Sequence, residues 1–365
     1  MMKKKFRSKN HTGAGRILIH GLSVCSVLVA IGCVYLTLSP LTQDLLSTLS
    51  RASVSLYLPQ SSSQSLTEKE IPSPSVSDPQ GEVFPSSTPS PSPENTPLPL
   101  TTPDPNRETQ AIRETQILGG TTNGFRILDR SGTEGIDYQA QADAFDAEIP
   151  RDGTPVILIY HTHTTESYQT TGNDWCYGDE SMRSMDPDET VVAVGEEIAG
   201  VLRRAGYGVI HDTTIHDSPA YTGSYDRSAQ TIRKNLEAYP TLCLTLDVHR
   251  DSLTDSDGNL LKTVAEINGQ KAAQFMIICG CGADPSLQFP DWQKNLQFGL
   301  SLQQKADEIY PGLSRPLYFL ERVYNENFTP CSLLVEFGTS GNTIEEARLT
   351  GRLFAEILID TLNEA

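Results

Sequence analysis

The chain has 365 residues, a formal net charge of −18 and 38% hydrophobic residues. Because its N-terminus is basic, the remainder is still more acidic, which argues against nucleic acid or an anionic membrane surface as a partner of the main domain. The seven cysteines lack the paired spacing of a zinc ribbon or a disulfide framework, so we interpret most of them as small buried side chains.

The N-terminal segment has the pattern of a membrane anchor. Residues 1–16 are rich in lysine and arginine, and Ile17–Leu38 contains no Asp, Glu, Lys or Arg. At 1.5 Å per residue this run spans about 33 Å, enough for a bilayer core of roughly 30 Å, and it exceeds a signal-peptide core. We expect a cytoplasmic tail (1–16), a single-pass transmembrane signal anchor (17–38) and the rest of the chain outside the cell membrane. A cleaved signal peptide or a buried helix is the alternative.

Residues 39–112 are interpreted as a disordered linker rich in Pro, Ser and Thr, as in Pro89-Ser-Pro-Ser-Pro93. Such a segment buries too little apolar surface to offset its ordering entropy, and proline keeps it extended. A lead-in over 113–149 and a catalytic domain over 150–365 follow it. Within the domain, the long loop 169–187 lies next to a candidate site, where loops of this length are more often functional than idle.

Apolar runs with strand character alternate with segments of helical periodicity. Asp257-Gly258 predicts a hairpin or loop, and Thr343 with Glu346 fits a capping box at the start of the last helix. The alternation predicts an α/β fold with a mainly parallel central sheet flanked by helices. The predicted strands are Val156–Ile159, Gly208–Asp212, Leu242–Val248, Phe275–Cys279, Leu317–Val323 and Leu333–Val335. The predicted helices are Asp188–Ala205, Tyr225–Tyr239, Asp291–Tyr310 and Thr343–Leu362.

Three of the predicted strands end in residues that can carry chemistry. The first is followed by His161, His163 and Glu166, the third by His249, and the last by Glu336. Ligand sites in open α/β sheets lie beyond the carboxyl ends of strands, and a catalytic Zn²⁺ needs about three protein ligands and one open position. We therefore predict a zinc site made from the histidines and Glu166, with Glu336 as the acid/base that moves the proton of water.

Several roles stay open on the residues alone. His163-x-x-Glu166 has the spacing of the first zinc pair in carboxypeptidase-like hydrolases, but His161 fits a ligand role equally well, and the spare histidine would orient a ligand. Arg250 is a candidate for holding a substrate carboxylate, with a structural ion pair as the alternative. Tyr225 and Arg227 are candidates for lining a substrate groove or for packing and capping the second helix.

Motifs along the domain resemble the stage II sporulation protein P family. They are His161-Thr-His-Thr-Thr-Glu-Ser-Tyr168, Val192-Ala-Val-Gly195, Gly208-Val-Ile-His-Asp212, Tyr221-x-Gly-Ser-Tyr-Asp-Arg-Ser228, Asp247-Val-His-Arg-Asp251 and Leu334-Val-Glu-Phe-Gly-Thr-Ser-Gly-Asn-Thr343. The resemblance implies a fold similar to zinc-dependent N-acetylmuramoyl-L-alanine amidases and hydrolysis of peptidoglycan at the muramoyl amide and at peptide cross-links. It also implies action during forespore engulfment at the engulfing membrane, with stage II sporulation proteins D and M as partners.

One departure concerns the acidic ligand. In the amidases a glutamate ligand typically comes from the start of the helix after the first histidine loop, and this chain has Asp186-Pro-Asp-Glu189 there. Glu166 is our preferred ligand, with Asp186 and Glu189 as alternatives. A zinc carboxypeptidase-like enzyme acting on small peptides and a non-catalytic wall-binding scaffold are the competing functional hypotheses.

Overall fold

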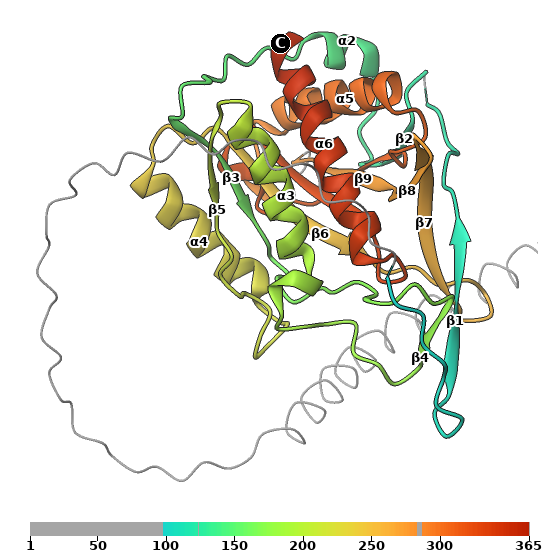
Figure 1. The fold of residues 1–365 in the computed structure, drawn as a ribbon. Coiled ribbons are helices and arrows are strands. Elements are labelled where there is room, and N and C mark those ends of the chain that lie inside the picture. The colour runs from blue at the N-terminus through green and yellow to red at the C-terminus, as the bar shows by residue number, and fades with distance from the viewer. Residues whose placement is uncertain (1–97, 123, 283–286, 365) are drawn as a thin grey trace, which may run out of the picture. The chain divides into compact units, whose positions relative to one another are not determined.

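The computed structural model describes residues 98–364, except 123 and 283–286 (Figure 1). The predicted cytoplasmic tail, the signal anchor and most of the linker lie outside these residues. Within the described part of the chain, no helix is both long and apolar enough to cross a bilayer.

Among the described residues, seven strands form the larger sheet, in the order β2-β10-β9-β11-β6-β3-β5. In that order they span Ile127–Arg130, Leu317–Leu320, Phe275–Gly280, Cys331–Thr339, Leu244–Asp251, Pro155–Tyr160 and Gly208–His211. Five of the six neighbouring pairs are parallel, and β11 with β9 is antiparallel. The predicted mainly parallel sheet is therefore corrected to a mixed one, because the direction of the strands reverses between β9 and β11.

Different helices pack on the two faces of this sheet. Residues on one face of the central strands pack into the main core with the helices α3, α5 and α6, and the opposite face packs on α4 near β3. Strand β3 shows the alternation: Ile157 and Ile159 join the main core, while Leu158 and Tyr160 face α4. Both faces are covered at β3, so its sequence is a continuous apolar run. The helices span Val191–Arg204, Ser224–Ala238, Trp292–Ile309 and Ile344–Glu364 for α3, α4, α5 and α6.

Helix starts follow the local sequence signals. The Thr190 side chain accepts a hydrogen bond from the Val192 amide at the start of α3, after the short 3-10 helix η1 (Pro187–Glu189). The predicted capping box of α6 is confirmed: the Thr343 amide donates to Glu346 Oε2 at 3.0 Å, and the Glu346 amide donates to Thr343 Oγ1 at 3.2 Å. These bonds satisfy amides that have no partner within the helix.

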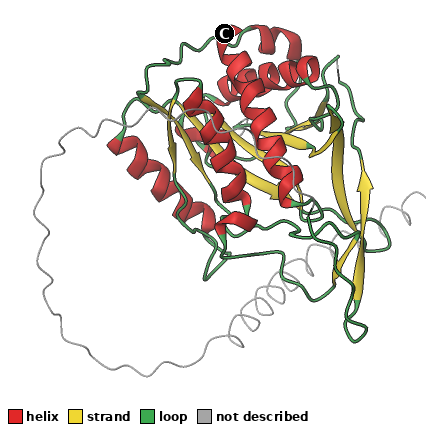
Figure 2. Ribbon diagram, viewed as in Figure 1, coloured by secondary structure: helices red, strands yellow, loops and turns green. Residues whose placement is uncertain are grey.

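A second, mixed sheet has four strands among the described residues, in the order β4-β1-β7-β8. Its longer strands are the yellow arrows on the right of Figure 2, which has the same view as Figure 1. Its strands span Trp175–Tyr177, Thr109–Thr115, Leu260–Ile267 and Gln270–Ala273. Strand β1 begins inside the predicted linker, because Ile112 is buried against residues of the neighbouring strands. The segment around Asp257-Gly258 is a loop closed by a bridge between Thr254 and Leu260, and the hairpin turn lies later, at Asn268-Gly269, where both residues have positive φ.

The rest of the lead-in packs on the larger sheet. Strand β2 is an edge strand parallel to β10, and it is followed by the short helix α2 (Tyr138–Asp143). Asp137 caps α2 through a hydrogen bond from the Ala140 amide. Phe125 and Tyr138 are buried in the main core.

Candidate active site

A cavity of about 630 Å³ lies beside the carboxyl ends of β3, β6 and β11. Strands β6 and β11 are parallel neighbours, and their register places Glu336 opposite His249. Alternation along β6 sends Leu246 and Val248 into the main core, so Asp247 and His249 share the opposite face. His163, Glu166, His249 and Glu336, predicted from three separate segments, all line this cavity.

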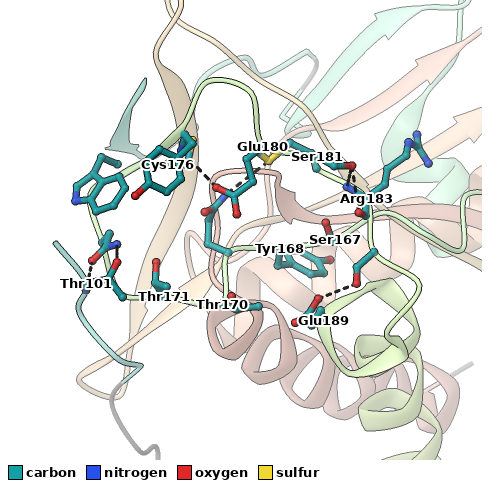
Figure 3. A pocket seen from close by; sticks show the side chains of 16 residues that line it. Thr101, Ser167, Tyr168, Thr170, Thr171, Cys176, Glu180, Ser181, Arg183 and Glu189 are labelled. Atoms are coloured by element: carbon teal, nitrogen blue, oxygen red, sulfur yellow. Dashed lines mark hydrogen bonds between the residues drawn. The ribbon is translucent and has the colours of Figure 1, made fainter. Parts of the chain in front are cut away.

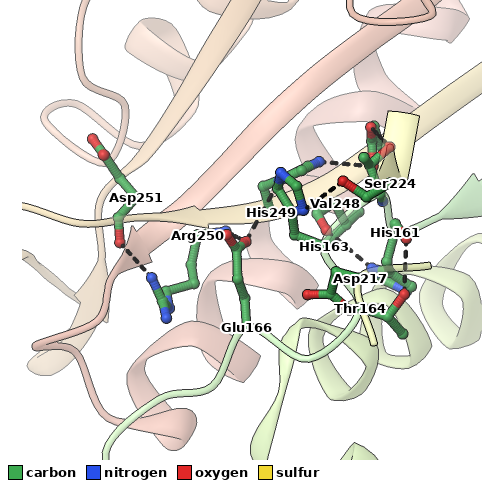
Figure 4. A network of polar contacts seen from close by, with 12 residues as sticks. His161, His163, Thr164, Glu166, Asp217, Ser224, Val248, His249, Arg250 and Asp251 are labelled. Carbon is green, nitrogen blue, oxygen red and sulfur yellow. Dashed lines mark hydrogen bonds and ion pairs between the residues drawn. The ribbon is translucent and has the colours of Figure 1, made fainter. Parts of the chain in front are cut away.

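His249 is the centre of the polar network (Figure 4). Its Nδ1 lies 3.4 Å from Glu166 Oε2, and its Nε2 lies 2.9 Å from Asp247 Oδ1. The second contact has ion-pair distance without hydrogen-bond alignment, so Nε2 has no hydrogen-bond partner among the described residues. Burial opposes the charged imidazolium, but Asp247 and Glu166 outweigh it and raise the pKa of His249 well above its ordinary value. Burial likewise opposes ionisation of Glu166, but His249 and then Arg250 lower its pKa.

His163 approaches His249 edge-on, with 5.1 Å between the ring centroids and 88° between the planes. Tyr221 stacks on its face at 4.4 Å, and Ser224 Oγ lies 3.3 Å from its Nδ1. Burial, with the nearby His249 as a second cause, lowers the pKa of His163 to about 4. The ring is therefore neutral at physiological pH, the form in which histidine binds metal ions.

Glu336 contributes a carboxyl group that forms no ion pair with the other described residues. Its Oε2 is buried and has no hydrogen-bond partner in the described residues. Burial raises the pKa of Glu336 to about 8, with Glu166 adding to the increase and His249 opposing it. A carboxyl group poised near neutral pH in a cavity is what general acid–base chemistry requires.

His161 lies away from the cavity, on the other face of the sheet. It follows Ile157 and Ile159 in the alternation of β3, so its ring enters the layer between the sheet and α3. The His161 Nδ1–H donates to the Val248 carbonyl at 3.0 Å, and Nε2 lies 2.9 Å from His211 Nε2. Both ring nitrogens are thus in use, and the structure favours His163 of the two candidates. Through Val248, His161 braces the strand immediately before His249.

The predicted motif that ends at Gly195 is explained by this histidine pair. A Cβ atom at position 195 would lie 2.7 Å from His211 Nε2 and 2.8 Å from His161 Cε1. Only a residue without a side chain leaves room for both rings against α3. His211 Nδ1 in turn lies 2.9 Å from Glu196 Oε2, which extends the network to the protein surface.

The structure also separates the three candidates for the acidic ligand. Glu189 accepts a hydrogen bond from Ser184 Oγ at 2.7 Å and lines a smaller neighbouring cavity of about 190 Å³ (Figure 3). Asp186 caps η1 by accepting from the Asp188 amide. Glu166 alone of the three lines the cavity that contains His163 and His249.

The two predicted substrate-binding arginines are occupied by backbone carbonyls. The guanidinium of Arg250 borders the cavity but donates to the carbonyls of Ser167, Asp251 and Met182. Arg250 thereby joins β6 to Ser167, just before the long loop, and to Met182 within it. A contact between Arg250 and a substrate carboxylate stays a prediction.

Arg227 holds a different loop and lies outside the residues that line the cavity. Its guanidinium donates to the carbonyls of His216, Thr222 and Ala220, which fixes the chain ahead of α4. Tyr225, two residues earlier on α4, does line the cavity and contacts His163 edge-on at 5.6 Å. Of these two predicted substrate contacts, Tyr225 thus borders the cavity and Arg227 does not.

Arg183 and Tyr324 also line the cavity, although neither was singled out from the sequence. Arg183 belongs to the long loop whose length indicated a functional role, and this was the signal that pointed toward it. Tyr324 carries no pattern that distinguishes it from other polar loop residues.

The side chains of the cavity include donor atoms of the kind that bind a metal ion. Two imidazoles and a carboxylate line the same cavity, and His249 Nε2 and Glu336 Oε2 are buried without a hydrogen-bond partner among the described residues. This donor set suits Zn²⁺. Within the part of the chain that the structure describes, no group of three His, Cys, Asp or Glu side chains is already arranged to hold a metal ion.

The mixed α/β fold with a buried histidine–carboxylate cavity defines a candidate hydrolase. The chain belongs to the stage II sporulation protein P family, whose match spans residues 66–359. It is 28% identical over 233 residues to "Stage II sporulation protein P" of Bacillus subtilis (strain 168), covering 60% of this chain and 55% of that protein. The match thus spans about half of the relative's length.

Solved structures of amidases are distantly similar. The N-acetylmuramoyl-L-alanine amidase AmiC2 of Nostoc punctiforme matches with 13% identity and a TM-score of 0.33, over 58% of this chain and 97% of the other. The N-acetylmuramyl-L-alanine amidase Ami1 from Mycobacterium smegmatis matches with 13% identity and a TM-score of 0.34, over 58% of this chain and 98% of the other.

Proposed function

We propose that this protein is a zinc-dependent peptidoglycan hydrolase that cleaves the N-acetylmuramoyl-L-alanine amide and also stem-peptide cross-links during sporulation engulfment. The observation that carries the proposal is the convergence of His163, Glu166 and His249 beside the unpaired carboxyl oxygen of Glu336. Membership of the stage II sporulation protein P family supports the sporulation role.

Each cavity residue has a distinct part in the proposed reaction. His163, Glu166 and His249 would hold Zn²⁺, which supplies Lewis-acid activation of water when bound. Glu336 would take a proton from the attacking water and deliver it to the amide nitrogen as the C–N bond breaks. Asp247 fixes the ring of His249, and Tyr221 fixes that of His163. A bound cation would also favour the ionised form of Glu336 that the base step requires.

The proposal includes a location and partners. The apolar segment over 17–38 would anchor the chain as a single-pass protein with its catalytic domain outside the membrane. Stage II sporulation proteins D and M would be its partners in engulfment, as the family resemblance implies.

The test is digestion of isolated sacculi by the full-length protein, with a chelator and with zinc added back, followed by mass spectrometry of the released fragments. Free stem peptides and peptide-free glycan, lost with chelator and restored by zinc, are expected. Cut cross-links with intact muramoyl amides would restrict the activity to an endopeptidase. Hydrolysis of small peptides with sacculi untouched would favour the carboxypeptidase-like alternative, and zinc-free protein that binds sacculi without cutting them would favour a scaffold.

A further inference from the structure

Arg183 is the cationic side chain of the cavity that keeps an open edge. Its side chain is 38% exposed, and it lines the cavity together with His163, Glu166 and Glu336. Arg250, the other arginine among the described lining residues, donates hydrogen bonds from its guanidinium to three backbone carbonyls. Arg183, which belongs to the long loop, is therefore the arginine that presents a positive charge to a substrate in this cavity.

The Arg183 guanidinium is held from behind by a buried carboxylate. Its Nη1 donates to Asp217, whose side chain is fully buried, and to Thr165 Oγ1 at 3.2 Å. Asp217 also accepts from the Thr165 amide and hydroxyl, so its oxygens are directed into the wall and away from the cavity. Tyr221 lies beneath the guanidinium at 5.0 Å. This arrangement fixes the direction of the side chain, and a fixed guanidinium loses little entropy when it binds a ligand.

The open edge of Arg183 lies next to the proposed reaction centre. The Arg183 Nη2 approaches Glu166 Oε1 only to 3.9 Å, too long for a hydrogen bond. The backbone at Arg183 is itself anchored, because it forms a bridge with Glu166 and the Ser184 amide donates to the Thr165 carbonyl at 2.9 Å. The guanidinium is thus a rigid, partly exposed donor within one side-chain length of a proposed metal ligand.

We infer that Arg183 is a specificity-determining residue that binds a free carboxylate in the peptide part of the substrate, close to the bond that is cut. The inference rests on the proposed function. A guanidinium edge matches a carboxylate with two parallel N–H···O bonds, whereas a carboxamide offers one acceptor and no charge. In a stem peptide, the second residue after the muramoyl amide, D-glutamate, carries such a carboxylate on its α-carbon. The structure therefore predicts a preference for this group over its amide.

The experiment compares two ligands that differ at one group. They are N-acetylmuramoyl-L-alanyl-γ-D-glutamyl-L-lysine amide and the same compound with D-isoglutamine in place of D-glutamate. Binding is measured by calorimetry on the full-length protein carrying Glu336→Gln, which prevents consumption of the ligand. We expect the acid to bind about 10-fold to 100-fold more tightly than the amide, the range for hydrogen bonds to charged groups.

Arg183→Gln should abolish this preference by weakening the acid alone, and Arg183→Lys should retain part of it. Because Arg183→Gln leaves Asp217 buried without its cation, the double variant Arg183→Gln, Asp217→Asn is measured as well. It should also bind the two ligands equally. Arg204→Gln, an exposed position on α3, is the matched control and should keep the full preference.

Equal binding of both ligands by the protein with Arg183 intact would overturn the inference. So would an equal loss for both ligands in Arg183→Gln, which marks a structural role, or no binding of either ligand. Since the measurement needs no turnover, a preference for the acid in a protein that leaves sacculi intact would uphold the inference and refute the proposed function. Zinc-dependent cutting of sacculi without any preference would do the reverse.

Discussion

Glu336 and His249 lie directly opposite each other on the paired strands β11 and β6, and both side chains border the same cavity. The register brings a carboxyl group with a raised pKa beside an imidazole that two carboxylates hold in place. Residues separated by more than eighty positions in the sequence are thereby fixed on two rigid strands. A site built on strands holds its groups more accurately than one built on loops.

Glu336→Gln is expected to lower the rate of sacculus hydrolysis by about 10²- to 10⁴-fold, the usual contribution of a general acid–base. Glutamine keeps the shape of the side chain but cannot accept and return a proton. Zinc content, measured on the same sample by elemental analysis, should not change, because Glu336 is not among the proposed ligands. Glu321→Gln, at an exposed position, serves as the control. Full activity of Glu336→Gln would remove this residue from the mechanism.

The two histidines of the first motif should respond differently to substitution. His163→Gln is expected to lower zinc affinity by at least about 10-fold, whereas the stability of the zinc-free protein should change little. His161→Gln should instead destabilise the fold by about 1–3 kcal/mol, because it disturbs a buried hydrogen-bonded pair. Zinc titration and urea unfolding of both variants make the comparison. Loss of zinc binding in His161→Gln with an unchanged stability would reverse the two assignments.

Gly195→Ala provides a test of the packing around His161 and His211. The added Cβ would lie under 3 Å from both rings, so we expect a destabilisation of about 1–3 kcal/mol, typical of overpacking. Gly200→Ala in the same helix is the control, since the nearest atom to its Cβ is the flexible Arg204 Nη1 at 3.4 Å. Its better helix propensity should leave stability unchanged or raise it by up to about 1 kcal/mol. Equal effects at the two positions would contradict the proposed contact.

Stability should fall in acid because of His161. Burial lowers the pKa of His161 to about 3, from an ordinary value of 6.5. As the pH falls below about 6.5, the unfolded chain gains a proton that the folded chain does not, so the free energy of unfolding decreases until about pH 3.

Urea unfolding of zinc-free protein between about pH 7.5 and pH 4.5 measures this effect as a difference between the unmodified chain and His161→Gln. The other titrating groups are common to both proteins. The unmodified chain should lose up to about 1.4 kcal/mol more per pH unit below pH 6. Parallel pH profiles would show that His161 is not held in its neutral form.

The sequence by itself identified most of the groups in the site. Strand ends and residue chemistry pointed to His163, Glu166, His249 and Glu336, and the capping box of α6 follows from local hydrogen bonding that needs no distant contact. Such features depend on residues close together in the chain, so their physics is present in the sequence.

Tertiary structure alone decided which side of the sheet each group faces and which groups are already engaged. His161 and His163 are two residues apart, yet one enters the layer under α3 and the other enters the cavity, because β3 ends at Tyr160 and the chain turns over 162–165. Arg250 and Arg227 were equivalent to Arg183 as cations in the sequence. Their guanidinium groups are bound by carbonyls from distant segments, while Arg183 keeps an exposed edge. The order of strands in the sheet and the hydrogen-bond partners of each arginine depend on contacts between segments far apart in the chain. No local sequence pattern specifies such contacts.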